Sequence, residues 1–489
     1  MRWLWVWLPI TLFLTCMGWA ALSPVGSSPD DDYHLSSIWC GSGTTPGRCE
    51  EAPGTTGVRL VPEAVVDSST CYRYHPEIDA GCQEQILQSR ALVRTDRVNV
   101  VQHLYPNGYY RVMSLLVSDD VGQSVFRVRL VNALIACLLL LALLRVLPPG
   151  LGSAAAMAVA VTFVPLGLSI VASTNPSSWT VTGIAVFWAA SLGLIARRGT
   201  GRGRVLLAAI VVVSAAMAIA SRVDGAAYVA IASGVVLALA GWAHVRRAAW
   251  RSTLVVGAGA AGLAAFATHG SGVAASGTPL GTADAGLGLL LTNAAYLPAL
   301  FQGVVGGWNL GWNDVVMPPA VPVIGTLVVG ALVYRAAAER KRGRWAGTIL
   351  AAAALVAVPL TFLQLQHLGV GEVVQPRYIL PLLTLLVGAL GLGRGLRRPL
   401  RLARGPAWLI GVALTVSATL AFWANAHRYL AGSQVGLFDP RFTSGWALPL
   451  GLSWWVIAVA TVLATAAFVA GCAMTASHSS WTGATRRLD

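Results

Sequence analysis

The 489-residue sequence is poor in charge, with 11% charged and 56% hydrophobic residues, whereas soluble domains carry roughly 25% charged residues. So few charges cannot cover a surface that faces water, and lipid must therefore contact much of the folded chain. The net charge of +14 does not indicate a nucleic-acid-binding protein, because the basic residues lie in short clusters between apolar segments, as membrane topology requires.

Apolar segments long enough to cross about 30 Å of hydrocarbon as helices occur about twelve times in the chain. Because unpaired backbone groups are too costly in lipid, helices are the expected spanning structure. The sequence therefore predicts an all-α polytopic membrane protein. The predicted spans are residues 3–22, 126–147, 154–173, 179–196, 205–220, 225–243, 253–267, 321–334, 345–365, 378–392, 407–424 and 448–472.

The first apolar segment, residues 3–22, has a basic start and small residues near its end. A cleaved signal peptide is therefore an alternative to a membrane anchor. The apolar run is long enough to span, however, and no clear A-x-A cleavage site follows it. These features favour an uncleaved anchor.

Arginines mark alternate connections between the predicted spans, and both chain ends carry them as well. Cytoplasmic connections are enriched in Lys and Arg, so we expect both termini to lie in the cytoplasm. The chain then divides into a first helix (1–22), an extracytoplasmic loop (23–124), helices two to seven (125–268), an extracytoplasmic or interfacial segment (269–320), helices eight to twelve (321–474) and a cytoplasmic tail (475–489).

The loop 23–124 has the composition of protein in water, since it holds thirteen of the twenty acidic residues. It also holds four of the seven cysteines, Cys40, Cys49, Cys71 and Cys82. Outside the membrane these would form disulfides, and we expect sequential pairing, although four cysteines permit three connectivities. A zinc site is the alternative, but no C-x-x-C spacing supports it.

The segment 269–320 contains an apolar stretch, residues 286–301, that glycine and proline interrupt. This pattern predicts an interfacial or re-entrant helix. Trp308 and Trp312 follow it, and tryptophan is suited to the membrane interface.

Residues 255–262 contain a G-x-G-x-x-G pattern, which in a soluble protein would suggest a dinucleotide site. Here the pattern lies inside an apolar run and has no alternation of strands and helices around it. Small residues in a membrane helix permit close helix packing. We therefore expect no dinucleotide cofactor.

The most informative sequence is Ser-Ser-Pro-Asp-Asp-Asp-Tyr-His at residues 27–34, directly after the first span. In an arbitrary membrane protein, Asp30, Asp31 and Asp32 would be a solvated boundary between membrane and water. Here His34 lies four residues after Asp30, and other outside segments supply arginines. Together these residues could hold a phosphate beside a carboxylate base.

At this point the sequence resembles the GT-C superfamily of polyprenyl-phosphate-sugar glycosyltransferases. More narrowly, it resembles a bacterial membrane-protein family that is named only as a domain of unknown function and is usually grouped with them. In that family the first external loop begins with a Pro-Asp-Glu-x-x-His pattern, matched by Pro29, Asp30, Asp31 and His34, with Asp31 in place of the usual glutamate.

Three further elements of the family have counterparts in the same order along the chain. A His-x-Pro-like element followed by tyrosines corresponds loosely to residues 103–110. A Gly-Trp-x-Asp element before a helix corresponds to residues 311–314. A Gln-x-Arg-Tyr element that opens a late span corresponds to residues 375–378, where Pro376 departs from the small residue expected there.

The resemblance implies an extracytoplasmic inverting glycosyltransferase that moves a sugar from a polyprenyl-phosphate donor to a cell-envelope glycan. It implies Asp30 as the catalytic base, and Asp31 as its support or as a ligand of a divalent cation (Mg or Mn), if one is needed. Arg377 is the first candidate for the donor phosphate. Further substrate-binding candidates are His34, His103, Arg222, Asp314 and Tyr378. Arg222 and Arg428 are weaker phosphate candidates, and Tyr33, Trp308 and Trp312 could stack on sugars.

Two other functions fit the span count. A transporter would place charged or broken-helix sites near the bilayer midplane, often in inverted repeats, and neither is visible in the sequence. A non-catalytic assembly protein of the cell envelope would tolerate neutralisation of all the outside carboxylates.

Overall fold

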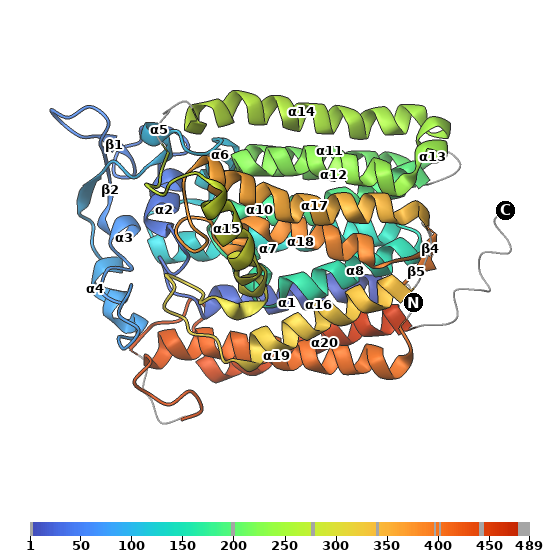
Figure 1. The fold of residues 1–489 in the computed structure, drawn as a ribbon. Coiled ribbons are helices and arrows are strands. Elements are labelled where there is room, and N and C mark those ends of the chain that lie inside the picture. The colour runs from blue at the N-terminus through green and yellow to red at the C-terminus, as the bar shows by residue number, and fades with distance from the viewer. Residues whose placement is uncertain are drawn as a thin grey trace.

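The computed structural model describes residues 3–196, 201–274, 279–338, 342–395, 398–400, 402–439 and 445–477. Its long helices run side by side in one bundle (Figure 1). Twelve of the described helices are long and apolar enough to cross a membrane, which confirms the predicted all-α polytopic membrane fold. The long helices are α1 (Leu4–Ala21), α7 (Val121–Val146), α8 (Pro149–Thr162), α10 (Ser177–Ala196), α11 (Arg202–Ser221), α12 (Val223–Ala240), α14 (Ala249–Ala274), α15 (Leu287–Gln302), α16 (Ala320–Ala338), α17 (Arg342–Leu365), α18 (Pro376–Leu390), α19 (Arg404–Ala431) and α20 (Trp454–Ser477).

The two ends of the bundle differ. The folded region between α1 and α7 covers one end, which we call the loop end and which lies at the left of Figure 1. At the opposite end α1 begins, α20 ends, and the short elements α13 (Trp242–Arg247), β4 (Leu392–Gly395) and β5 (Arg398–Pro399) lie. The helices that flank the arginine-rich connections end there, so we call it the arginine end. The two classes of connection that arginine content separates in the sequence therefore lie at opposite ends of the bundle.

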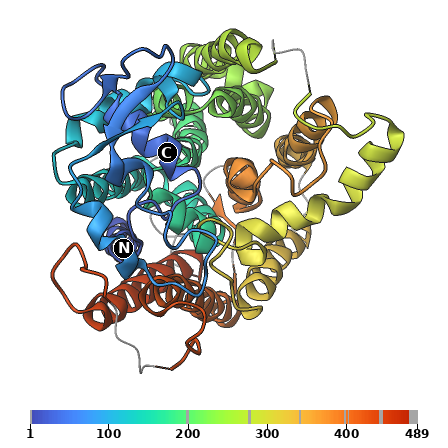
Figure 2. The same ribbon diagram turned by 90° about the vertical axis from the view of Figure 1, so that its left-hand side faces the viewer.

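The predicted spans include α18 and leave out α15. Length and apolar composition alone give the opposite result: α15 with its continuation η4 (Gly303–Gly307) qualifies as a span, and α18, with 15 residues, is too short. In Figures 1 and 2, however, α15 lies across the loop end at a steep angle to the long helices, whereas α18 runs along them. Nearly all residues of α18 are buried, so protein rather than lipid surrounds this short helix.

The loop region packs around Leu35, Ile38, Trp39 and Val61 in a second core, which continues into α7, α10 and α11. Its three strands form an antiparallel sheet in the order β1-β2-β3. Disulfides join Cys40 to Cys49 and Cys71 to Cys82, which confirms the predicted sequential pairing. The elements are α2 (Asp31–Trp39), β1 (Glu50–Glu51), β2 (Arg59–Pro62), α3 (Glu63–Val66), η1 (Ala80–Gln83), α4 (Glu84–Leu87), β3 (Leu92–Thr95), α5 (Asn99–Gln102), α6 (Gly108–Met113) and η2 (Ser114–Leu116).

Two helix breaks pack against each other close to the loop end. The first, η3 (Phe163–Gly167), separates α8 from α9 (Leu168–Val171), and the second is η4. Gly306 in η4 has φ +97°, and a Cβ there would lie 2.7 Å from Val321 and 3.3 Å from Pro165. A left-handed backbone and this close approach both require glycine. The contact between the two breaks therefore depends on that residue.

The G-x-G-x-x-G pattern lies inside α14, which packs against α12. A Cβ at Gly262 would lie 2.5 Å from the carbonyl oxygen of Ala226, and one at Gly259 would lie 2.9 Å from Ser233. The glycines thus allow two membrane helices to approach closely, as small residues do at such interfaces.

Candidate functional site

The three consecutive aspartates after the first span point to three different sets of partners. Asp30 precedes α2 with a left-handed backbone, φ 61° and ψ 23°, a conformation that aspartate adopts more readily than most residues. Because the chain turns there, Asp30 lies beside Arg377, Asp31 contacts Thr174, and Asp32 binds Arg97.

Asp30 and Arg377, which the sequence predicts as a base and a phosphate ligand, form an ion pair. The Nη2 atom of Arg377 lies 2.6 Å from Oδ2 of Asp30, and 39% of the Asp30 side chain is exposed but only 2% of the Arg377 side chain. Burial works against the charge of Asp30, but the adjacent guanidinium holds the pKa of this carboxyl below its ordinary value. Asp30 is therefore ionised at neutral pH.

The Arg377 guanidinium has hydrogen-bond donors that the protein does not use. Its Nε and Nη1 atoms are buried and have no hydrogen-bond partner among the described residues, while Nη2 also contacts the hydroxyl of Tyr378 at 3.3 Å. Buried donors without partners are costly. An anion that reached this guanidinium would satisfy them.

A cavity of about 330 Å³ opens beside this pair. Its walls come from the turn before α2, from α9, from the segment that follows η4, and from the start of α18. The residues that line it are Pro29, Asp30, Tyr74, Leu166, Ser169, Ile170, Gly303, Trp308, Asn309, Leu310, Gly311, Trp312, Asn313, Gly371, Glu372, Gln375, Pro376 and Arg377. Segments that are more than 300 residues apart in the sequence thus meet in one site.

Asp31 does not line this cavity. It is fully buried, accepts a hydrogen bond from the backbone N–H of Ser28 at 3.0 Å and another from the hydroxyl of Thr174 at 2.5 Å. Burial raises the pKa of Asp31 to about 6. These contacts hold the turn that presents Asp30, so Asp31 is placed as a positioning residue and not as a second carboxylate in the site.

The arrangement does not fit a divalent cation held by Asp30 and Asp31 together, because Asp30 faces Arg377 and Asp31 faces Thr174. Within the described parts of the chain, no group of three or more histidine, cysteine, aspartate or glutamate side chains could hold a metal ion.

The loop 172–176 contacts the turn that carries Asp30. Asn175 donates from Nδ2 to the carbonyl of Pro29 at 3.3 Å, and the hydroxyl of Tyr109 donates to the carbonyl of Thr174 at 2.8 Å. Arg129, which is buried in α7, donates to the carbonyls of Ser23 and Pro24 in the segment that leads to Asp30. The position of Asp30 is therefore fixed from two sides.

The predicted site histidines lie away from the cavity lining. His34 is fully buried, its Nδ1 lies 2.9 Å from the hydroxyl of Tyr110, and its Nε2 has no described partner. Burial lowers the pKa of His34 to about 3, so the ring is neutral at neutral pH. His103 is exposed at the end of α5. Neither ring lines the cavity, and the His34 ring packs among Tyr33, Tyr105 and Tyr110 inside the loop region.

Arg222 and Tyr378 form a layer next to Arg377. Arg222 pairs with Asp224 at 2.7 and 3.1 Å, and its guanidinium lies 4.5 Å from the centre of the Tyr378 ring. Arg377 lies over the same ring at 5.1 Å. The charge of Arg222 is thus already paired with Asp224, and both guanidinium groups lie near the ring of Tyr378.

Asp314 and Arg428 pair with each other and do not line the cavity. Their side chains are 3% and 4% exposed, and Nη2 of Arg428 lies 2.9 Å from Oδ2 of Asp314. Arg428 also donates to the carbonyls of Tyr72, His75 and Ile78 in the loop region. Arg428 therefore joins α19 both to the segment that carries Asp314 and to the loop region. Neither residue lines the cavity, and their roles in substrate binding stay predictions.

Sequence reasoning did not single out Glu372 or Tyr74, which both line the cavity. Glu372 could have been noticed as one of the few acidic residues outside the loop 23–124, only five residues before Arg377. Tyr74 has no comparable signal, because a tyrosine between two paired cysteines fits any small disulfide-bonded loop.

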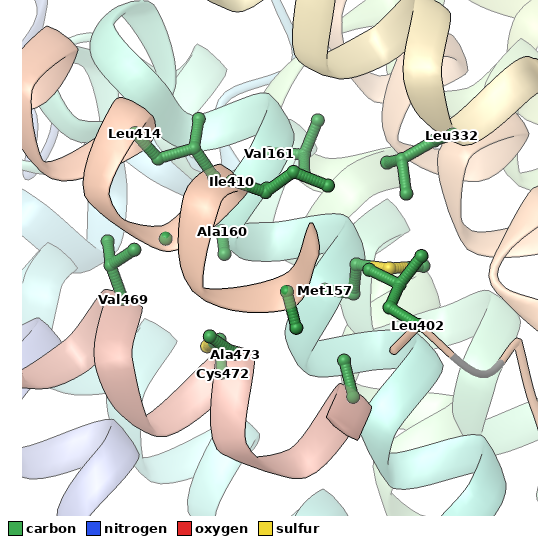
Figure 3. A pocket seen from close by; sticks show the side chains of 13 residues that line it. Met157, Ala160, Val161, Leu332, Leu402, Ile410, Leu414, Val469, Cys472 and Ala473 are labelled. Carbon is green, nitrogen blue, oxygen red and sulfur yellow. The ribbon is translucent and has the colours of Figure 1, made fainter. Parts of the chain in front are cut away.

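A second hollow lies near the arginine end, between α8, α16, α19 and α20 (Figure 3). Its volume is about 30 Å³, which is the share of one water molecule in the liquid. Apolar side chains line it, among them Met157, Leu332, Ile410 and Cys472. It offers neither the space nor the polar groups of a functional site.

The fold and the cavity define a class of protein: a polytopic helical membrane protein whose bundle carries a carboxylate–guanidinium pair in a cavity at the loop end. The chain belongs to the family described as "Predicted membrane protein (DUF2142)", which it matches over residues 13–386. That segment includes Asp30, both helix breaks and Arg377. No curated protein and no solved structure matches the chain.

Proposed function

We propose that the protein is an inverting glycosyltransferase of the GT-C type that uses a polyprenyl-phosphate-linked sugar and modifies a cell-envelope glycan outside the cytoplasm. The observation that carries the proposal is the Asp30–Arg377 pair in the wall of the cavity at the loop end. One ionised carboxylate and one guanidinium with free donors are the two groups that this transfer needs from the protein.

In the proposed reaction, the acceptor hydroxyl attacks the anomeric carbon of the donor sugar, and Asp30 takes the hydroxyl proton. The bond between that carbon and the phosphate oxygen breaks, and the polyprenyl phosphate leaves with the bonding electrons. Arg377 stabilises the phosphate as its charge develops, because a guanidinium can donate two hydrogen bonds to it.

The ion pair links donor binding to the state of the base. Nη2 of Arg377 is engaged by Asp30 while Nε is free, so a phosphate that binds Nε and Nη2 competes with Asp30 for the guanidinium and weakens its contact with the carboxylate. Loss of that contact raises the basicity of the carboxylate. Donor binding would thus activate the base, and the lowered pKa of Asp30 belongs to the state without donor.

Neighbouring side chains suit a lipid-borne donor. Leu166, Ile170 and Trp308 line the same cavity as Arg377, and they supply an apolar surface next to the charged group. The arginine-rich connections at the other end support an extracytoplasmic loop end by the positive-inside rule, where a donor carried by the bilayer would be available.

The test is Asp30→Asn in purified protein reconstituted in lipid, supplied with decaprenyl phosphate that carries a radiolabelled pentose or hexose and with isolated cell-envelope glycan. We expect transfer to fall at least about a hundredfold, since a positioned base contributes roughly 10²–10⁴ in rate. Asp119→Asn is the matched control, because Asp119 is 74% exposed in a surface pair with Arg48. Transfer by Asp30→Asn at the control rate would remove Asp30 from this role.

A transporter remains a second candidate because η3 and η4 are paired helix breaks beside the cavity, and broken helices form the binding sites of many carriers. Flux of the labelled lipid-linked sugar across proteoliposomes, without a change in its glycosidic linkage, would favour the carrier over the transferase.

A further inference from the structure

One wall of the cavity is aromatic and amide-rich, and the proposed chemistry does not use it. Trp312, Tyr74, Asn309 and Asn313 line this wall, whereas Asp30, Glu372 and Arg377 supply the charged groups of the same cavity. The charged residues fit the proposed transfer reaction, but the aromatic and amide residues require a separate role.

Trp312 is held in one orientation by the protein. Its indole Nε1–H donates to the carbonyl of Gly26 at 2.7 Å, and its backbone N–H donates to Oδ1 of Asp314 at 3.1 Å. Asp314 is fixed in turn by Arg428. Gly311, with φ +62°, makes the tight turn possible, because a Cβ there would lie 2.6 Å from the hydroxyl of Tyr429.

Two residues of the disulfide-closed segment 71–82 contact the Trp312 ring, and one of them, Tyr74, also lines the cavity. The guanidinium of Arg73 lies 4.7 Å from the centre of the Trp312 ring, and Arg73 is itself 3.8 Å from Oδ2 of Asp32. Tyr74 packs against Trp312 edge to face, with ring centres 5.9 Å apart, yet 64% of Tyr74 is exposed. A tyrosine that contributes so little to a core, but lines a cavity, is placed to contact a ligand.

Membrane anchoring, the ordinary use of interfacial tryptophan, does not account for Trp312. Its N–H donor is consumed within the protein, and its ring contacts Arg73 and Tyr74 of the loop region. A rigid aromatic surface with amide groups beside it has the chemistry of a carbohydrate site: the ring covers the C–H face of a sugar, and the amides bind its hydroxyls. Asn309 and Asn313 are both exposed here.

We propose that Trp312 and Tyr74 form a platform that binds a neutral sugar unit of the acceptor glycan. The acceptor is favoured over the donor because Tyr74 belongs to the loop region, which is the water-soluble part of the chain, while the donor is carried by lipid. The cavity of about 330 Å³ lies near the lower limit of small-molecule sites, roughly 300–1,000 Å³, and has room for a monosaccharide or disaccharide unit. The assignment as acceptor rests on the proposed function, whereas sugar binding itself does not.

This assignment gives Asp314 and Arg428 a second role. They do not line the cavity, but they fix the turn that carries Trp312. They are positioning residues for the platform, and Arg428 also holds α19 to the loop region.

The test is saturation-transfer NMR with the full chain in lipid nanodiscs and a panel of neutral tri- to hexasaccharides of glucose, galactose, mannose and arabinose. We expect at least one oligosaccharide to bind, and Trp312→Leu to weaken its binding at least about tenfold, as for an aromatic hot spot. Tyr74→Leu should weaken it less, and it guards against misfolding because Tyr74 is exposed. Trp455→Leu is the matched control, since Trp455 is 57% exposed on α20, away from the cavity.

Failure of every oligosaccharide to bind, or equal binding by Tyr74→Leu, Trp312→Leu and the control, would overturn the platform. The Asp30→Asn variant separates this inference from the proposed function. Binding that persists in Asp30→Asn while transfer is lost supports both. Loss of binding in Trp312→Leu, together with normal transfer in Asp30→Asn, would keep the platform and reject the proposed base.

Discussion

At the residue scale, neighbouring charged side chains of one sequence cluster have separate roles. Asp30 faces the cavity, Asp31 holds the turn, and Asp32 pairs with Arg97. The left-handed backbone at Asp30 turns successive side chains in different directions. Sequence reasoning could identify the cluster from its position after the first span, but a pattern of three identical letters could not say which one faces a ligand.

Sequence likewise could not tell which arginine is available to bind a ligand. Arg377, Arg222 and Arg428 were all candidates for a phosphate, because each lies at the loop end of a predicted span. Their partners decide between them: Arg222 has Asp224, Arg428 has Asp314 and three carbonyls, and Arg377 keeps two nitrogen atoms without described partners. Pairing between distant segments cannot be read from a single sequence.

The Asp314–Arg428 pair gives a prediction about stability. Arg428→Met removes the cation from a buried carboxylate and leaves the carbonyls of Tyr72, His75 and Ile78 without their donor. Breaking a buried pair in this way costs about 3–5 kcal/mol. We expect a lower midpoint of thermal unfolding in detergent and faster proteolysis of the segment 71–82.

Arg59→Met makes the same substitution in a more exposed pair, with Glu51, in which the two side chains are 21% and 71% exposed. Such pairs contribute roughly 0–1 kcal/mol. If Arg428→Met unfolded at the same temperature as Arg59→Met, the contacts of Arg428 with Asp314 and with the loop-region carbonyls would not stabilise the fold.

At the element scale, hydropathy and arginine placement were sufficient to predict the helices that run between the two ends. Those signals work because the bilayer acts on every span in the same way. They also predict that α15 is not a span, since glycine and proline interrupt its apolar stretch. They could not predict that η3 and η4 pack together and that α9 and α18 form two walls of one cavity, because this depends on how helices distant in sequence pack.

The placement of α15 gives a prediction about depth in the membrane. Nitroxide labels at Leu287 and Tyr296, which are 69% and 64% exposed, should lie at similar depth if the helix lies across the loop end. A spanning helix would separate the two labels by roughly 14 Å along the membrane normal, at 1.5 Å per residue. Power-saturation EPR with oxygen and a nickel chelate measures this difference.

Labels at Val323 and Val333 on α16 provide the comparison, because both side chains are well exposed on a long helix of the bundle. Their depths should differ by roughly 15 Å. A depth difference on α15 as large as that on α16 would make α15 a thirteenth crossing, and the two ends of the bundle would then no longer alternate.

At the scale of the whole molecule, charge and disulfides both support the prediction that the loop end lies outside the cytoplasm. Acidic residues and both disulfides gather in the loop region, while arginines cluster in the connections at the opposite end. Disulfides persist in oxidising compartments, and arginine-rich connections stay in the cytoplasm. The two arguments are independent, since one depends on redox chemistry and the other on membrane insertion.

This orientation can be tested with a membrane-impermeant maleimide on intact cells. Arg90→Cys in the loop region and Arg246→Cys in α13 introduce thiols at exposed positions, and the three cysteines outside disulfides are buried, so they give little background. We expect the maleimide to label Arg90→Cys on intact cells, and Arg246→Cys only after permeabilisation. The reverse pattern would put the Asp30–Arg377 pair on the side where nucleotide sugars are available, and the reason to expect a lipid-linked donor would be lost.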